Sequence, residues 1–152
     1  MNAEKEIVVR KAARKDVDGI IEVLQSTKLG AEAWTSDERW TRKVLERCLT
    51  LENYVLLVAE YNKKIVGFVD CCVFPSFWEG AYQGIINHLF VLPGFQGRGV
   101  GAMLIEAVVK EADTKGLGEL HVSTERENIK ARRLYAKYGF TEECLLLERI
   151  GE

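Results

Sequence analysis

Apolar side chains recur at helical spacing in four parts of the chain, and residues 17–24 are the plainest example. Thr35 is followed three residues later by Glu38 in a capping-box pattern, and Asn128 stands where the last helix would begin. Gly116 comes where the third of these segments ends, as glycine commonly does after a helix. The pattern predicts helices over residues 17–24, 35–48, 99–115 and 128–138.

Runs rich in β-branched and aromatic residues lie between these helices. The tripeptide 62–64 separates two such runs and indicates a hairpin turn, so these two strands should pair antiparallel. Residues 28–34 are expected to form a loop, as are residues 75–84, which contain proline and glycine. The predicted strands cover 7–12, 54–61, 65–74, 85–92, 119–124 and 142–150.

The order of these elements predicts an α/β (α+β) fold with a mixed sheet. The strand 85–92, the helix after it and the next strand form a βαβ unit, whose two strands should be parallel. The hairpin nearer the N-terminus is antiparallel. There is no repeat and no linker, so we expect one domain over residues 1–152.

Composition and charge exclude several classes of partner. The chain of 152 residues is 47% hydrophobic with a net charge of -2, which supplies no overall attraction to nucleic acid or to an anionic membrane. No apolar run approaches the roughly 18 residues that span a bilayer, and residues 1–16 lack the apolar core of a signal peptide. The four cysteines show neither a disulfide framework nor metal-ligand spacing. We expect a soluble, cytoplasmic protein without a metal.

The segment "PGFQGRGVGAML" (93–104) concentrates glycines at positions 94, 97, 99 and 101 where a helix begins. Glycine weakens helices, so such a cluster indicates close approach of a ligand to the backbone. Gly97, Gly99 and Ala102 fit a dinucleotide fingerprint, but too little chain follows for a doubly wound sheet. A P-loop would need Lys and Ser or Thr after the glycines. A pyrophosphate at the helix N-terminus is the third interpretation, because free N–H groups gather there.

At this point the sequence resembles the GNAT superfamily of N-acetyltransferases. The resemblance covers residues 85 to about 140: Leu89, Val91 and Pro93 precede the glycine motif, and Asn128 begins a helix that carries Tyr135 and ends in "YGF". It implies a mostly antiparallel sheet with one splayed parallel strand pair and helices on both faces. It also implies transfer of an acetyl group from acetyl-CoA to a primary amine by direct attack in a ternary complex. A coenzyme A-binding module without catalysis is the alternative, followed by a dinucleotide-binding protein.

The resemblance assigns the coenzyme site residue by residue. Backbone groups of Leu89, Phe90 and Val91 would pair with the pantetheine arm and polarise the thioester carbonyl. Asn128 would face the same groove, or would serve only as a helix cap. The pyrophosphate cradle would consist of Gln96, Gly97, Arg98, Gly99, Val100, Gly101 and Ala102, in which Arg98 is either a phosphate ligand or a solvated side chain.

Three residues are candidates for proton transfer. By the resemblance, Tyr135 would be the general acid that protonates the leaving thiolate, although its spacing alone also fits a core residue. A primary amine is protonated at neutral pH, so a base must act before it attacks. His88 is one candidate because it titrates near pH 7, and a structural histidine is the alternative. Glu79 is the other, either as base or as a carboxylate that binds a cationic substrate.

The acceptor amine is not named by the sequence. A small amine, a peptide N-terminus, a lysine side chain and an aminoglycoside all fit the family. Aromatic and acidic loop residues would form its pocket or a contact between two copies in a homodimer: Glu32, Trp34, Phe77, Trp78, Glu79 and Tyr82. Four basic residues of the last predicted helix would touch coenzyme phosphates or face solvent: Lys130, Arg132, Arg133 and Lys137.

Overall fold

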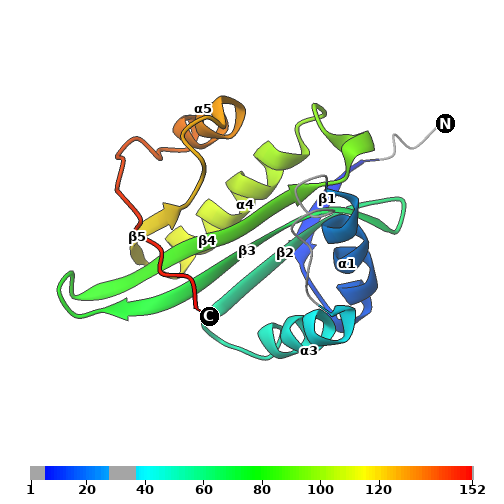
Figure 1. Cartoon of the computed structure of the whole chain (residues 1–152), viewed down its shortest axis with the longest axis horizontal. Coiled ribbons are helices and arrows are strands. Elements are labelled where there is room, and N and C mark those ends of the chain that lie inside the picture. Colours follow the sequence, from blue (N-terminus) through cyan, green and yellow to red (C-terminus); the bar gives the residue numbers. More distant parts are fainter. Residues whose placement is uncertain (1–5, 28–36, 152) are drawn as a thin grey trace.

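A five-stranded mixed sheet forms the centre of the computed structural model, which describes residues 6–27 and 37–151 (Figure 1). The strands lie in the order β1-β2-β3-β4-β5, and every neighbouring pair is antiparallel except β4 and β5. The mixed sheet with its parallel pair is therefore confirmed. The bounds are β1 (Val8–Lys11), β2 (Tyr54–Tyr61), β3 (Lys64–Ser76), β4 (Ala81–Val91) and β5 (Leu117–Val122).

Helices cover both faces of the sheet, as expected. Helices α1 and α3 lie over one face, and α4 lies over the other (Figure 1). The close approach of α4 requires Gly67 on β3, because a Cβ there would lie 3.2 Å from Leu104 and 2.9 Å from the carbonyl oxygen of Phe90. The helices are α1 (Val17–Ser26), α3 (Glu38–Cys48), α4 (Val100–Thr114) and α5 (Ile129–Lys137). None of those within the described ranges is both long and apolar enough to cross a membrane.

Residues 75–84 are not the loop that the sequence predicts. Strand β3 continues through Pro75, and β4 begins at Ala81, so only residues 77–80 turn between them. The pairing of β2 with β3 ends at Cys72, so among the described strands none pairs with this side of β3 at Pro75. Proline is tolerated there because its missing N–H can face this open side.

The strand predicted over residues 142–150 is also wrong. No strand is recorded in the described part of this segment, and Leu145 and Leu147 are 84% and 83% exposed. An apolar run becomes a strand only where a neighbouring strand supplies hydrogen bonds and a packed face. This segment has neither.

Helix α3 begins at Glu38, with the Asp37 carboxylate accepting a hydrogen bond from the Arg39 backbone N–H at 2.9 Å. The predicted cap Thr35 and the predicted loop 28–34 lie outside the described residues. Asn128 caps α5 as expected, since its Oδ1 accepts a hydrogen bond from the Ala131 N–H at 3.2 Å.

Strand β4 has two irregular features that shape the candidate site, a β-bulge and an early end to its pairing with β5. In the pairing with β3, Cys71 is opposite Ile86 and Asp70 is opposite His88, so Asn87 is an extra residue that forms a β-bulge. The parallel pairing with β5 runs from Tyr82 to Ile86 and ends there. The second half of β4 therefore leaves its parallel neighbour directly at the bulge.

Candidate active site

His88 and Asp70 form a pair across strands β4 and β3. Nδ1 of His88 lies 3.0 Å from Asp70 Oδ1 and 3.2 Å from Oδ2, and the backbone N–H of His88 donates to Oδ1 at 2.7 Å. A carboxylate accepts hydrogen bonds, so Nδ1 carries the proton and Nε2 keeps its lone pair. Asp70 is buried, whereas the His88 side chain is 52% exposed. The geometry thus orients an imidazole whose basic nitrogen can reach a substrate.

Tyr54 on β2 completes this cluster. Its hydroxyl donates to Asp70 Oδ2, and the Asn87 side chain hydrogen-bonds the same hydroxyl. Burial and the nearby Asp70 carboxylate raise the pKa of Tyr54 well above its usual range, so the phenol stays protonated. The hydrogen bond that His88 donates to Asp70 raises the pKa of His88 above its ordinary value, and partial burial opposes this. His88 is therefore a stronger base than a free histidine.

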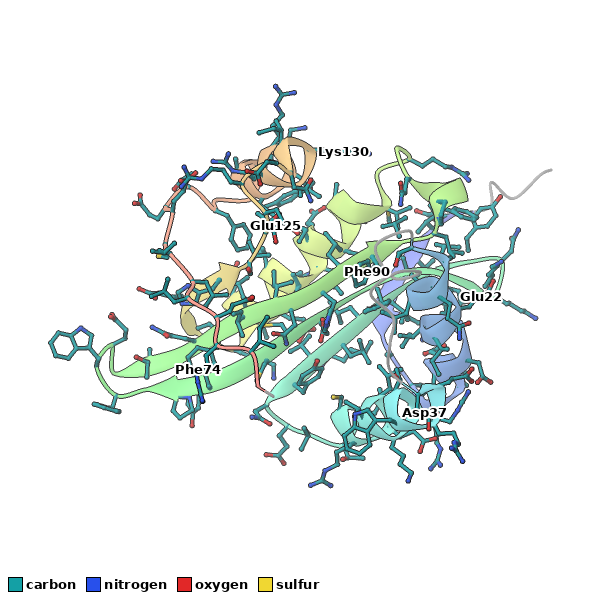
Figure 2. All side chains as sticks on the ribbon, in the orientation of Figure 1. Glu22, Asp37, Phe74, Phe90, Glu125 and Lys130 are labelled. Carbon is teal, nitrogen blue, oxygen red and sulfur yellow. The ribbon has the colours of Figure 1, made fainter. Side chains whose placement is uncertain are left out.

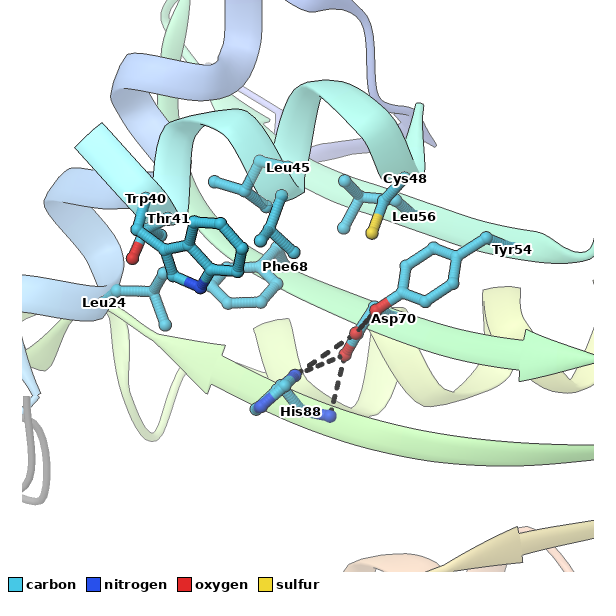
Figure 3. Close-up of a pocket in the computed structure, with 11 residues that line it drawn as sticks. Leu24, Trp40, Thr41, Leu45, Cys48, Tyr54, Leu56, Phe68, Asp70 and His88 are labelled. Atoms are coloured by element: carbon cyan, nitrogen blue, oxygen red, sulfur yellow. Dashed lines mark hydrogen bonds and ion pairs between the residues drawn. The ribbon is translucent and has the colours of Figure 1, made fainter. Parts of the chain in front are cut away.

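The cluster stands at one end of a cavity of about 280 Å³ on the face of α1 and α3 (Figure 3). The indole of Trp40 and the ring of Phe68 lie at the other end in this view. Most lining residues are apolar and come from α1, α3, β2 and β3. They are Leu24, Trp40, Thr41, Val44, Leu45, Cys48, Tyr54, Leu56, Phe68, Asp70 and His88.

The second half of β4 offers backbone groups to a ligand. The Leu92 N–H donates to Val66 of β3 at 2.8 Å, and backbone groups alternate in direction along a strand. Those of Leu89 and Val91 therefore face away from β3, on the side that β5 has left. Gln96 Nε2 donates to the Val91 carbonyl on this side at 3.1 Å. Phe90, labelled on β4 in Figure 2, packs against the rings of Phe68 and His88 instead.

The glycine loop forms an open cradle at the start of α4. Gly97 and Gly99 have φ of +73° and +82°, and a Cβ at either position would meet no atom within 4 Å. The first intrahelical bond runs from the Met103 N–H to the Gly99 carbonyl, so the N–H groups of Val100, Gly101 and Ala102 have no helical acceptor. Unpaired N–H groups beside open space fit a phosphate group.

Arg98 lies beside this cradle but is held by aromatic rings. Its guanidinium carbon is 4.9 Å from the ring centre of Phe95 and 5.7 Å from that of Tyr61. Such cation–π contacts typically contribute about 0.5–1 kcal/mol at exposed sites, so they do not prevent the side chain from turning toward a phosphate.

Tyr135 on α5 is a buried residue. The residue is 8% exposed, its ring packs against Phe140 at 5.8 Å, and burial raises the pKa of its phenol. Within the described chain, no side chain forms a hydrogen bond with the Tyr135 hydroxyl. Every fully buried side-chain oxygen or nitrogen of the described residues has a hydrogen-bond partner, so an oxygen without a partner cannot be fully buried. The hydroxyl therefore reaches the surface. Leu134, one residue before, lies 3.5 Å from the Cβ position of Gly101, which places α5 against the glycine end of α4.

The basic residues of α5 differ in their surroundings. Arg132 pairs with Glu143 and donates to the Arg126 carbonyl at 3.2 Å, so it already has partners. Lys130, labelled in Figure 2, is exposed, as are Arg133 and Lys137.

The hairpin residues predicted for the acceptor pocket do not line the cavity. Glu79 is exposed at the hairpin tip, and Phe77 and Trp78 are 99% and 89% exposed. Ser76 is six positions beyond Asp70 along β3, roughly 20 Å at about 3.3 Å per residue. The structure therefore does not bring Glu79 together with His88. Glu32 and Trp34 lie outside the described residues.

Sequence patterns alone do not predict the roles of Asp70 and Tyr54 or the cavity wall formed by α3. A signal for Asp70 existed, because it is the one charged residue in the strand predicted over 65–74. A buried carboxylate in an apolar strand requires partners, which Tyr54 and His88 supply. In the described part of the chain, no group of three or more His, Cys, Asp or Glu residues could hold a metal ion.

Comparison with known proteins gives a consistent family. The sequence profile of the acetyltransferase (GNAT) family matches residues 18–140. An uncharacterized N-acetyltransferase of Archaeoglobus fulgidus is 32% identical over 130 residues, which cover 84% of this chain and 88% of that protein. Another, from Methanocaldococcus jannaschii, is 29% identical over 143 residues; they cover 93% of this chain but only 63% of that protein.

A solved structure supports the same fold. An aminoglycoside N-acetyltransferase in complex with CoA superposes with a TM-score of 0.82 at 19% identity, over 99% of this chain and 98% of that one.

Proposed function

The chain belongs to the acetyltransferase (GNAT) family, and from this premise we propose that it is an enzyme that moves an acetyl group from acetyl-CoA to a primary amine by direct attack in a ternary complex. One observation carries the proposal. The oriented His88–Asp70 pair stands between the partly open cavity and the half of β4 that has left β5.

Acetyl-CoA would bind along the splayed half of β4 and the start of α4. The outward backbone groups of Leu89 and Val91 would pair with the pantetheine arm, and a main-chain N–H there would polarise the thioester carbonyl. The free N–H groups from Val100 to Ala102 would hold the pyrophosphate, with space provided by Gly97 and Gly99. We also expect coenzyme contacts from four further residues: Phe90, Gln96, Arg98 and Asn128.

His88 would start the reaction as general base. Its Nε2 takes a proton from the substrate ammonium, and the freed amine lone pair attacks the thioester carbonyl carbon. The C–N bond forms, the C–S bond breaks, and its electron pair leaves with sulfur. Tyr135 gives its proton to that sulfur, and the second amine proton returns through water to Tyr135. Once His88 releases its proton, ammonium and thioester have become amide, thiol and one free proton.

The surroundings of His88 favour its role as general base, and those of Tyr135 favour its role as general acid. Asp70 raises the pKa of His88, which favours proton uptake from an ammonium of pKa near 10.4. Burial raises the pKa of Tyr135, which keeps it protonated until a thiolate forms. The surface-reaching hydroxyl is the part of Tyr135 that can meet a ligand.

Release of free thiol from acetyl-CoA, measured against a broad panel of amines, tests this function. We expect amine-dependent release in the wild type and a loss of about 10²-fold or more in His88→Gln. Saturable coenzyme binding with no amine-dependent release from any amine would instead support a binding module without catalysis. Failure to bind coenzyme A would contradict both.

A further inference from the structure

The cavity beside His88 has the size of a small ligand. Its volume of about 280 Å³ equals that of nine or so water molecules at about 30 Å³ each, so it suits an organic molecule of about ten non-hydrogen atoms. A substrate of several sugar rings would extend far beyond it.

The walls of the cavity are apolar and incompletely covered. Trp40 is 64% exposed and Val44 is 42% exposed, although both line the cavity, and no residue of α3 is fully buried. Leu24, Leu45 and Phe68 continue the apolar wall onto α1, α3 and β3. An apolar ligand would bury these surfaces, which is the driving force that such a pocket offers.

The Asp70 carboxylate, which lines the cavity, already has hydrogen-bond partners within the protein. Asp70 accepts hydrogen bonds from the backbone and ring of His88 and from the Tyr54 hydroxyl. Asp70 and His88 are the residues of the described lining with a carboxylate or a basic nitrogen, and no Lys or Arg lies among them. A second ammonium on the substrate would find Asp70 already occupied. A substrate carboxylate would find only His88, which has to receive the proton of the amine.

We propose that the acceptor is a primary monoamine on an uncharged apolar or aromatic frame, with the frame against Trp40 and Phe68 and the amine at Nε2 of His88. This inference rests on the proposed function and names its substrate class. Polycations such as aminoglycosides and amino acids with a free carboxylate should be poorer acceptors, because the described lining offers no free partner for a second charge.

Three small primary amines test the charge requirement in the thiol-release assay: 2-phenylethylamine, L-phenylalanine and 1,4-diaminobutane. L-phenylalanine adds a carboxylate to the first probe, and 1,4-diaminobutane has a second amine and no aromatic ring. We expect kcat/KM for 2-phenylethylamine to exceed the other two by about 10-fold or more. A preference for L-phenylalanine, for the diamine or for an aminoglycoside would overturn the proposed class while leaving acetyl transfer intact.

A matched pair of tryptophan variants tests the location. Trp40→Ala removes part of the cavity wall, whereas Trp78→Ala makes the same change at the hairpin tip, where the side chain is 89% exposed. We expect Trp40→Ala to raise KM for 2-phenylethylamine about 10-fold with a small effect on kcat, and Trp78→Ala to leave both unchanged. Equal effects of the two variants would overturn the assignment.

Calorimetry of amine binding without acetyl-CoA separates this inference from the proposed function. Saturable binding of 2-phenylethylamine that weakens in Trp40→Ala but not in Trp78→Ala supports the cavity as its site, even if no thiol is released. Absence of binding at millimolar amine, with acetyl-CoA present as well as absent, overturns the inference. Lack of thiol release from every amine would count against the proposed function alone.

Discussion

The Oδ1 atom of Asp70 on β3 lies within hydrogen-bond distance of two nitrogens of His88 on β4, the backbone nitrogen at 2.7 Å and the ring Nδ1 at 3.0 Å. One carboxylate oxygen thus fixes both the strand and the ring of the same residue. The imidazole cannot turn without losing a hydrogen bond to a buried carboxylate, and such a loss is costly. This relationship makes His88 a prepared base and gives the first prediction.

The pH dependence of kcat/KM should follow the proton on His88. The unprotonated imidazole is the active form, so the rate should rise with pH through a midpoint above 6.5, because Asp70 raises the pKa of His88. Asp70→Asn removes that stabilisation of the imidazolium, so its midpoint should move to lower pH and kcat should fall about 10²-fold or more. Rate measurements from pH 5.5 to about 9 check both, with chemistry confirmed as rate-limiting.

Tyr54→Phe provides the opposite change as its control. Removal of the hydroxyl leaves more negative charge on Asp70 to face His88, so the midpoint should move to higher pH. Shifts of the two variants in the same direction would contradict the assignment of Asp70 as the partner that sets the pKa of His88.

Glu79→Gln should leave kcat and KM unchanged. The side chain stands exposed at the hairpin tip, far along β3 from the Asp70–His88 pair. Steady-state kinetics with one amine, beside His88→Gln, check this. A drop in kcat as large as that of the histidine variant would return Glu79 to the candidates for the base.

Tyr135→Phe should lower kcat by a factor of ~10 to ~1,000, while the affinity for acetyl-CoA changes much less. The ring keeps its contact with Phe140, so the fold should be retained, and the surface-reaching hydroxyl alone is lost. Single-turnover kinetics and calorimetry with acetyl-CoA measure the two quantities. Wild-type kcat under conditions where chemistry limits the rate would leave Tyr135 with a packing role only.

Gly99→Val should abolish acetyl-CoA binding, because a branched side chain would occupy the open space before the first N–H groups of α4. Gly116→Val is the matched control at the other end of the same helix. Both glycines have positive φ, +82° and +67°, and neither Cβ would meet another atom within 4 Å. Each variant should therefore bear a similar strain of about 1–2 kcal/mol, but only the first should lose calorimetric binding.

Asn128→Ala should destabilise the protein by about 1 kcal/mol, since it removes the cap of α5. In a chain of this size that corresponds to a fall in Tm of about 2–4 °C. Asn128→Ser retains a capping oxygen and should restore most of the loss, as urea unfolding and thermal scans can measure. A weaker affinity for acetyl-CoA in Asn128→Ser, which keeps most of the stability, would show that Asn128 also contacts the ligand.

Local patterns predict much of this fold because they reflect interactions that local sequence controls. The apolar spacing of α1 and α4 and the hairpin between β2 and β3 follow directly from it. The predictions are wrong where pairing between strands determines whether a segment becomes a strand. Pro75 and Gly80 indicate a loop, yet β3 and β4 continue because each supplies the other with hydrogen bonds. Residues 142–150 have a strand-like composition, but no described strand pairs with them.

The candidate active site was harder to predict from the sequence for a related reason. His88 and the glycine loop are contiguous features that a motif can carry. Asp70 lies opposite His88 only because of the register between β3 and β4. This register includes a bulge that no local sequence pattern predicts. The wall of α3 likewise depends on how one helix packs over a sheet. The sequence contains the residues but not their registration.

The extra residue Asn87 has a consequence for how such a site can arise or be lost. Without the bulge, the pairing of Cys71 with Ile86 would place Asn87 opposite Asp70 and turn His88 to the face of α4. Loss of the Leu89 codon, with the rest of the pairing to β3 kept, would therefore place an amide instead of an ionisable ring opposite Asp70 while every other residue survived. Insertion of one codon into a regular strand could create the reverse, so the acid–base pair is separated from an inert sheet by one small step in evolution.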